Sequence, residues 1–417
     1  MTLNATGQIS LGGATLGQSI ALEINQTSNS TISLNDYNIR TLFGDASGAI
    51  SLGNGYSKNA GPGYSLWGCG LNNASEFGNG LATNASSPVQ IATGLSWSWS
   101  HISIGSYHSM LLKGDGTLWA TSTGAVNGQL GVGNTLLYSS FVQVGAMTNW
   151  ANVACGYLST FATKTDGTLW AWGYNAQGEL GTGNIINYSS PVQVGALTNW
   201  ASVACGYQFT AATKTDGTLW AWGINTYGQL GQTNIVSYSS PVQVGALTNW
   251  SKIVAGKQHL MAIKTDGTLW GCGYNGNGAL GYSTNLIAYS SPVQIGALTN
   301  WLSVGATTAS TFATKTDGTL WAWGINNNSN LPTSNGVFYS SPVQVGSLTN
   351  WASIYSFCTS YGALASKTDG TLWGWGRSLY GQLAQPVANY SSPVQVGTSA
   401  SWVIVAVGPY NVIGVQS

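Results

Sequence analysis

Short runs of alternating apolar and polar residues return at a regular interval along most of the chain. In one such interval, residues 160–172 form two runs around Asp166-Gly167, a dipeptide typical of a tight β-hairpin. A shorter run at residues 153–156 precedes this hairpin, and a fourth run at residues 192–194 follows a polar loop. The Ser-Ser-Pro triplet before the fourth run suits the entrance of a strand, where proline needs no N–H partner. Each interval therefore predicts four short antiparallel strands.

The run after the hairpin carries a tryptophan that recurs every 50 to 52 residues, at Trp67, Trp119, Trp170, Trp220, Trp270, Trp321 and Trp373. Trp170 and Trp172 are two residues apart and project from one face of their strand, while Leu169 and Ala171 occupy the other. A sheet that is apolar on both faces is buried only between neighbouring sheets, and a closed ring needs no terminal caps. The pattern therefore predicts an all-β fold, a seven-bladed β-propeller of four-stranded antiparallel blades.

The two ends of the repeat region predict how the ring closes. The chain enters the repeats at a third strand, near Trp67, and leaves them after a second strand near Gln416. Each end is therefore half a blade. We expect residues 401–417 to complete a split blade with residues 64–91, so that residues 64–417 form the propeller.

The first 58 residues differ from the repeats, because they contain no tryptophan. Short alternating segments stand between turns rich in glycine and asparagine, which predicts a small β-rich arm or module over residues 1–58. Residues 59–63 (NAGPG) form a Pro/Gly linker. A segment this short is a weak candidate for a core of its own, so we expect a partner chain to complete it.

The charge balance limits the kinds of partner. The chain carries 11 Lys and Arg and 11 Asp and Glu, and six Lys-x-Asp-Gly hairpins hold more than half of them. A neutral surface gains nothing from counterion release, so we expect no nucleic-acid partner. No apolar stretch reaches the length of a membrane span, which predicts no membrane insertion. The N-terminus also lacks the basic start and apolar run of a secretory signal.

Residue types that carry catalysis are scarce. The three histidines are His101, His108 and His259, and the last two share a repeat position that other copies fill with Ser159 or Phe209, which indicates a structural role. No zinc-protease, nucleophile-elbow or phosphate-loop motif is present. We therefore expect a non-enzymatic protein with no catalytic, metal or cofactor site. The five cysteines are predicted to be buried, and each hairpin Asp to cap its own turn beside a solvated Lys.

Aromatic residues are the candidate contact groups. Tryptophans at fixed strand positions are predicted to form interblade core rather than a carbohydrate platform. Trp97 lies outside every repeat series, which makes it a candidate for an exposed aromatic. A tyrosine also precedes each Ser-Ser pair and is a candidate for a contact ring at one rim, with packing as the alternative; these residues are Tyr138, Tyr188, Tyr238, Tyr289, Tyr339 and Tyr390.

The repeat unit resembles that of the regulator-of-chromosome-condensation family over about residues 64–417. The resemblance depends on residues that return in register, among them Gly206, Asp216-Gly217, Leu219-Trp220, Trp222-Gly223, Asn225 and Gly228-Gln229-Leu230-Gly231. It implies a seven-bladed propeller. Family members include an exchange factor on chromatin, ubiquitin-ligase appendages and an enzyme inhibitor, so the shared property it implies is a rigid disc that grips another protein.

The N-terminal module resembles the opening of many tailed-bacteriophage virion proteins over residues 6–58. The residues that carry this resemblance include candidate attachment residues at Ile32, Leu34, Arg40, Ile50 and Leu52. It implies a virion structural protein, assembled in the host bacterial cytoplasm, with a tail-associated fibre or adhesin as the expected role. Other virion proteins would bind the N-terminal module, and the propeller would face a glycan or protein of the host surface.

An alternative from another class is a regulatory protein-binding propeller, of the GTPase exchange factor or inhibitor type. A chromatin role would favour a basic face, and the chain has few cations outside its hairpins. The sequence leaves the receptor, the place on the virion and a homo-oligomeric state open.

Overall fold

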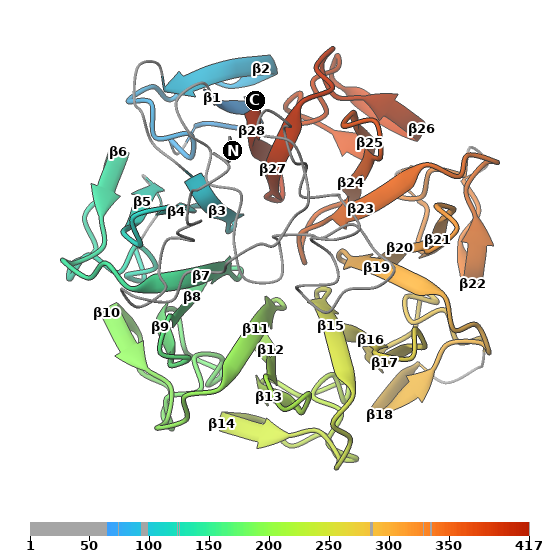
Figure 1. Cartoon of the computed structure of the whole chain (residues 1–417), viewed down its shortest axis with the longest axis horizontal. Helices are drawn as coiled ribbons and strands as arrows, with labels where there is room; N and C mark the ends of the chain where they lie inside the picture. Colours follow the sequence, from blue (N-terminus) through green and yellow to red (C-terminus); the bar gives the residue numbers. More distant parts are fainter. Residues whose placement is uncertain are drawn as a thin grey trace, which may run out of the picture. The chain divides into compact units, whose positions relative to one another are not determined.

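The structure is a computed structural model, and it describes residues 65–73, 75–92, 99–122, 124, 126–283, 287–327, 329–333 and 336–416. These residues form seven four-stranded antiparallel sheets, arranged as blades around a central channel (Figure 1). No helix occurs within the described ranges. The predicted all-β, seven-bladed propeller is confirmed.

Each blade runs from an innermost strand at the channel to an outermost strand at the rim. The innermost strands are β3 (Trp99–Ile104), β7 (Trp150–Cys155), β11 (Trp200–Cys205), β15 (Trp250–Ala255), β19 (Trp301–Ala306), β23 (Trp351–Tyr355) and β27 (Trp402–Val407). The second strands are β4 (Ser109–Lys113), β8 (Ser159–Lys164), β12 (Phe209–Lys214), β16 (His259–Lys264), β20 (Ser310–Lys315), β24 (Gly362–Lys367) and β28 (Asn411–Gln416). The third strands are β1 (Ser65–Gly70), β5 (Leu118–Ser122), β9 (Leu169–Gly173), β13 (Leu219–Gly223), β17 (Leu269–Tyr274), β21 (Leu320–Gly324) and β25 (Leu372–Ser378). The outermost strands are β2 (Ala85–Ala92), β6 (Tyr138–Gln143), β10 (Tyr188–Gln193), β14 (Tyr238–Gln243), β18 (Ala288–Gln294), β22 (Tyr339–Gln344) and β26 (Ala388–Gln395).

Blades 1 to 6 begin at β3, β7, β11, β15, β19 and β23, and blade 7 is the split one. Its strand order is β2-β1-β28-β27, so the two ends of the described chain share one sheet. Leu66 of β1 pairs with Val415 of β28, and Gly68 pairs with Ile413. The predicted closure is therefore confirmed, and antiparallel pairing joins the two ends of the ring.

The Asp-Gly hairpins between second and third strands form as predicted. Asp166 Oδ1 accepts hydrogen bonds from the backbone N–H of Thr168, at 2.9 Å, and from its hydroxyl, at 2.6 Å. Gly167 takes φ 77°, which places it in the left-handed region that favours glycine. The same cap recurs in the other hairpins, where the aspartate is Asp115, Asp216, Asp266, Asp317 or Asp369.

The prediction that the hairpin lysines are solvated is wrong. Lys164 is buried, and its Nζ lies 3.7 Å from the ring centroid of Trp170 and 5.2 Å from that of Trp150. The two indoles meet nearly edge to face, with centroids 6.2 Å apart, and the lysine covers them. The hairpin lysine therefore makes a cation–π contact and shields the end of the interblade core with its stem.

The outermost strand begins earlier than predicted. Tyr188 already pairs with Gly173, and regular pairing resumes at Val192 after a register shift. Pro191 therefore lies inside β10 rather than before it. The bulge and the edge position tolerate it, because no ladder bond needs its missing N–H.

Buried tryptophans fasten neighbouring blades together, as predicted. Trp222 is fully buried in blade 3, and its Nε1 donates to the Glu179 carbonyl of blade 2 at 2.8 Å. The Thr210 hydroxyl donates to the same carbonyl at 2.9 Å. Tryptophans buried in this way cannot serve as a carbohydrate platform. All five cysteines are free thiols; four are buried as predicted, whereas Cys205 is only half-buried. The predictions for residues 1–64, including the attachment residues and the linker, lie outside the described residues.

Candidate functional site

Strand direction gives the propeller two different faces. The first strand of each blade leads into a turn on one face, and the loop between the third and fourth strands lies on that same face. The Asp-Gly hairpins and the loops between blades lie on the opposite face, where the Gly167 carbonyl accepts from Trp200 N at 3.1 Å. We call the face with the Asp-Gly hairpins the hairpin face. We call the opposite face, where the turns after the innermost strands lie, the tyrosine face, because tyrosines gather there around the channel.

Tyrosines surround the mouth of the channel on the tyrosine face. They follow the innermost strands or their turns, and they are Tyr107, Tyr157, Tyr207, Tyr361 and Tyr410. The rings of Tyr157 and Tyr207 lie 4.5 Å apart, and Tyr410 contacts Tyr380 at 5.5 Å. Burial, followed by the neighbouring hydroxyls of Tyr207 and Tyr107, raises the pKa of Tyr157 to about 12. The Tyr157 phenol is therefore neutral at physiological pH.

Two cations complete this ring. Lys257 Nζ lies 5.2 Å from the ring centroid of Tyr207, and Arg377 Cζ lies 5.7 Å from that of Tyr361. Neither forms a salt bridge with a carboxylate of the described residues. The exposed carboxylates of these residues lie in the hairpins of the opposite face. We call this set of tyrosines and two cations the mouth ring. It offers hydrogen-bond donors, flat aromatic area and positive charge.

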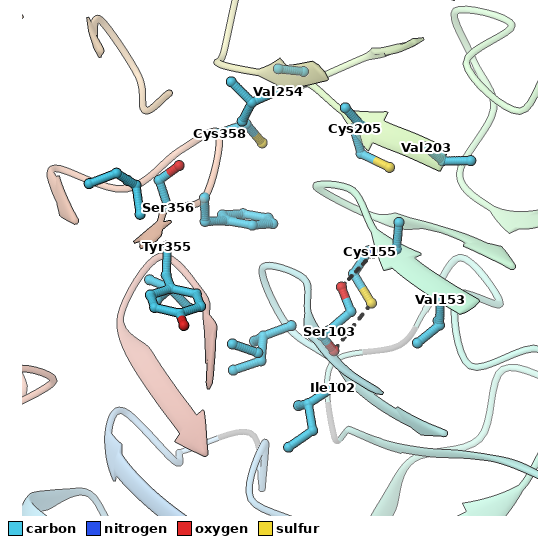
Figure 2. Close-up of a pocket in the computed structure, with 18 of the residues that line it drawn as sticks. Ile102, Ser103, Val153, Cys155, Val203, Cys205, Val254, Tyr355, Ser356 and Cys358 are labelled. Carbon is cyan, nitrogen blue, oxygen red and sulfur yellow. Dashed lines mark hydrogen bonds between the residues drawn. The ribbon is translucent and has the colours of Figure 1, made fainter. Parts of the chain in front are cut away.

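The channel below the mouth ring is lined mainly by aliphatic side chains, together with polar ones such as Ser103 and Ser356. A cavity of about 290 Å³ lies between the innermost strands, and Val153, Val203 and Val254 are among its lining residues (Figure 2). Burial raises the pKa of the Cys155 and Cys358 thiols to about 12, so both stay protonated. Protonated thiols are poor nucleophiles and poor metal ligands, so this lining supplies packing surface rather than reactive groups.

One loop of blade 6 narrows the mouth. The sequence shows this blade with two extra residues between its first and third strands and without the glycine that five of the other six blades have after the first strand. The extra length folds inward and buries Phe357 and Cys358 against the channel. Ser356 Oγ accepts from Ala306 N at 2.9 Å, and the Ser360 carbonyl accepts from Thr308 N at 3.3 Å. The mouth ring is therefore asymmetric, with one blade supplying a plug.

A protein-family model described as RCC1-like domain matches residues 151–417. The chain belongs to this RCC1-like domain family. Its fold is similar to that of Prp20p from Saccharomyces cerevisiae, with 18% identity over 85% of this chain and 91% of that chain and a TM-score of 0.75. The yeast RCC1 (Prp20) structure with Kap60 gives 17% identity, coverages of 97% and 96% and a TM-score of 0.76. Human WBSCR16 gives 16% identity, coverages of 85% and 99% and a TM-score of 0.74.

The tyrosines that the sequence predicts as a contact ring stand on the outermost strands of this RCC1-like propeller, not at its mouth. Trp97 falls outside the described residues. The six tyrosines before the Ser-Ser pairs lie on or at the start of the outermost strands, half-buried against the core clusters. The Tyr188 hydroxyl accepts from Asn184 Nδ2 at 2.8 Å and so braces the preceding loop. Sequence reasoning missed the mouth ring, although the Gly-Tyr pairs after the first strands were a visible signal.

The buried histidines of the RCC1-like repeats have structural surroundings. His108 Nε2 lies 2.9 Å from the Thr160 hydroxyl of the next blade, and His259 makes the same contact with Thr311 at 3.2 Å. Burial lowers the pKa of His108 to about 3 and that of His259 to about 4, so both are neutral. No group of three or more His, Cys, Asp or Glu in the described residues is arranged to hold a metal ion. The described residues also contain no helix that would cross a membrane.

Glu179 gives a pH-dependent prediction. It is buried, Oε2 accepts from Gln177 N at 2.8 Å, and burial raises its pKa to about 7 from 4.5. The folded state then holds a proton that the unfolded state releases near pH 4.5, so this residue lowers stability progressively as pH rises from 4.5 through 7. The sister blades place Gln129 and Gln229 here, with the same contact. We expect Glu179→Gln to raise the free energy of unfolding by roughly 3 kcal/mol at pH 8.

Urea unfolding followed by circular dichroism measures this difference. At pH 4 the two proteins should have nearly equal stability, because the carboxyl is then neutral in both states. An equal gain at pH 4 and pH 8 would show that the carboxylate is not the cause.

Proposed function

We propose that this RCC1-like propeller is a non-enzymatic, regulatory binding protein that holds a partner protein against its tyrosine face. The mouth ring is the observation that carries the proposal. It gathers four half-buried tyrosines, the exposed Tyr107 and two cations that form no salt bridge within the described residues. Tyrosine and arginine are the residue types enriched at the energetic centres of protein interfaces.

The charge distribution limits the partner's chemistry. In the described residues the cations outside the hairpins are Lys252, Lys257 and Arg377, and two of these stand in the mouth ring. A partner segment with carboxylates beside apolar or aromatic groups would complement the ring. Lys257 and Arg377 would pair with the carboxylates, and the tyrosines would supply contact area at low entropic cost.

The family and the similar structures favour the regulatory function over the virion role. The first of those structures concerns the binding of Prp20p to Gsp1p and histones, and the second is yeast RCC1 (Prp20) bound to Kap60. The low identity means that these partners are only candidates here. The virion location and the fibre or adhesin role depend on residues 6–58, outside the described part, and stay predictions.

Binding to purified Gsp1p and to core histones tests the proposal by biolayer interferometry. We expect the full-length protein to bind the GTPase, and Tyr157→Ala with Tyr207→Ala to weaken binding roughly tenfold or more, because truncated aromatic anchors carry large interface energies. Lys257→Gln with Arg377→Gln should weaken it less and reduce its dependence on salt.

Leu197→Ala with Leu247→Ala is the matched control, since both leucines are exposed on the loops of the hairpin face. Thermal melts would show that all the variants fold. Equal affinity of the tyrosine variant and the control would contradict the assignment of the face. If the protein bound neither Gsp1p nor core histones, the regulatory function inferred from the family would be contradicted.

A further inference from the structure

The loops between the third and outermost strands expose a ring of large apolar side chains on the tyrosine face. Each of these side chains lies within three residues before the half-buried tyrosine of its blade, where the outermost strand begins at the periphery (Figure 1). Their exposed fractions are 51 to 67%. We call this set the apolar collar; it comprises residues 136–137, 185–186, 235–236 and 337–338 of blades 1, 2, 3 and 5, Ile287 of blade 4 and Val387 of blade 6.

Hydrogen bonds hold the backbone that carries the collar. In blade 2, Asn184 Oδ1 accepts from Ile186 N at 2.9 Å, and Asn184 Nδ2 donates to the Tyr188 hydroxyl at 2.8 Å. The buried Asn175 donates from Nδ2 to the Ile186 carbonyl at 3.0 Å. Blades 1 and 3 repeat the first two bonds, and the asparagine there is Asn134 or Asn234. Because the loop is already ordered, covering its apolar side chains costs little conformational entropy.

The surroundings of the collar carry no exposed charge. The charged residues of these loops are Glu76 and Glu179, and both are buried. The hairpin face is different, because its aspartates, such as Asp166 and Asp216, are exposed. A surface laid on the collar loses its water, so the carboxylates of the hairpin face would be poor neighbours for it. The collar therefore suits an uncharged, apolar surface rather than the hairpin face of another copy.

The collar is large and regular enough to meet a second collar. Its side chains expose on the order of 1,000 Å², and each partner in a stable interface buries about 800 Å². The blades follow one another regularly around the ring (Figure 1), so a twofold axis in the plane of the face and through one blade superposes the blades of two copies. An axis through blade 7, which has no collar residue, leaves every collar residue opposite another. Twofold contacts of this kind use one patch on both copies.

This axis also separates the like charges of the mouth ring. Blades 1, 2 and 3 of one copy meet blades 6, 5 and 4 of the other. Lys257 of blade 4 then faces blade 3, which carries Tyr207, and Arg377 of blade 6 faces blade 1, which carries Tyr107. Each cation is therefore placed opposite a tyrosine rather than opposite its own copy, an arrangement that favours cation–π contacts.

We propose that the apolar collar is the contact surface of a face-to-face dimer of this chain, with its twofold axis through blade 7. The dimer covers the mouth ring, so self-association and the binding of a partner protein exclude each other. That consequence depends on the proposed function, whereas the dimer itself does not.

Sedimentation velocity of the full-length protein at about 1 to 100 µM tests the proposal. We expect a monomer–dimer equilibrium without larger species. The collar variant combines Ile185→Thr, Ile186→Thr, Ile235→Thr and Val236→Thr, which keep a branched side chain and the backbone bonds of the loops. It should weaken dimerisation roughly tenfold or more, because apolar surface is lost and each substitution acts twice in a twofold contact. Ile185→Ser with Ile235→Ser is a second variant, in case the first does not fold.

The matched control changes exposed leucines in the loops of the hairpin face and combines Leu197→Thr, Leu247→Thr, Leu298→Thr and Leu348→Thr. It should leave dimerisation unchanged, and thermal melts show whether each variant folds. A bismaleimide tests the axis. It should link two chains of Ile186→Cys with Val337→Cys, because blades 2 and 5 meet, and it should link Ile186→Cys alone poorly.

The other occupants of the collar give different results. A monomer at every concentration, or a dimer that neither folded collar variant weakens, would overturn the proposal. So would oligomers that grow with concentration and dissociate in the hairpin-face variant, since these indicate head-to-tail stacking. A monomer that floats with phosphatidylcholine vesicles would also overturn it, because the collar would then cover a lipid surface.

Discussion

A chain that ends at Ala400 is expected to lose its cooperative fold. The deletion removes β27 and β28, so β1 (Ser65–Gly70) loses one of its two antiparallel neighbours and keeps only β2. It also removes Val412, Ile413 and Val415, which are buried in the two cores beside the split blade. Burial of three such side chains contributes roughly 5 kcal/mol or more. That is comparable to the whole stability of many domains, about 5–15 kcal/mol.

Circular dichroism and analytical size exclusion measure this outcome. We expect an expanded or aggregating protein, because the open ring exposes an unpaired edge at β1 and a bare face of blade 6. A chain that ends at Val415 is the matched control. It loses one residue of the β28 pairing and keeps all three buried side chains, so it should melt close to the full-length protein. A sharp, reversible melt of the shorter chain would mean that six blades are sufficient without closure.

The fold was predictable because its signals repeat. The period gives the blade count, the Asp-Gly dipeptide gives the hairpin, and the half blades at each end of the repeats give the closure. Each of these depends on local chemistry or on counting. The strand start at Tyr188 was missed, because the pairing continues through a bulge that a proline conceals in the sequence.

The contacts between blades were harder to predict. Lys164 was expected to be in solvent, because nothing in the sequence shows that Trp150 and Trp170 meet beside it. For the same reason, the sequence does not show that Ala384, which replaces the glycine of other blades, lies opposite Cys69. The two residues are distant in sequence and adjacent only across a blade boundary. Repeat alignment gives equivalence of positions, and only the packed ring shows which positions share a space.

The candidate site shows the same difference between features that repeat in the sequence and contacts that only the packed ring brings together. The tyrosines before the Ser-Ser pairs attracted attention because they repeat in register, yet regular repetition here marks packing, as the contact of Tyr188 with Asn184 illustrates. The mouth ring is irregular, with Tyr157 and Tyr207 in two blades and Lys257 in the next. Radial geometry brings these residues together, because each follows the inner strand that lines the channel.

Trp222→Ala is expected to lower the free energy of unfolding by about 3–5 kcal/mol, as truncation of a large buried aromatic does. Trp222 is fully buried, and its Nε1 donates to the Glu179 carbonyl. Its ring centroid lies 5.9 Å from that of Trp200 and 6.4 Å from that of Phe161. The substitution removes these contacts and leaves a cavity whose walls are held by two separate sheets. Because both sheets are fixed in a closed ring, the cavity cannot collapse by moving one blade alone.

Trp220→Ala is the control within the same strand, and urea unfolding measures both variants. Trp220 is half-buried, its Nε1 donates to Thr218 within its own hairpin, and Lys214 covers it at 3.6 Å. Its loss exposes the end of the core to water but opens no sealed void, so we expect a smaller destabilisation. Equal losses would mean that the ring relaxes around Trp222 as easily as water replaces Trp220.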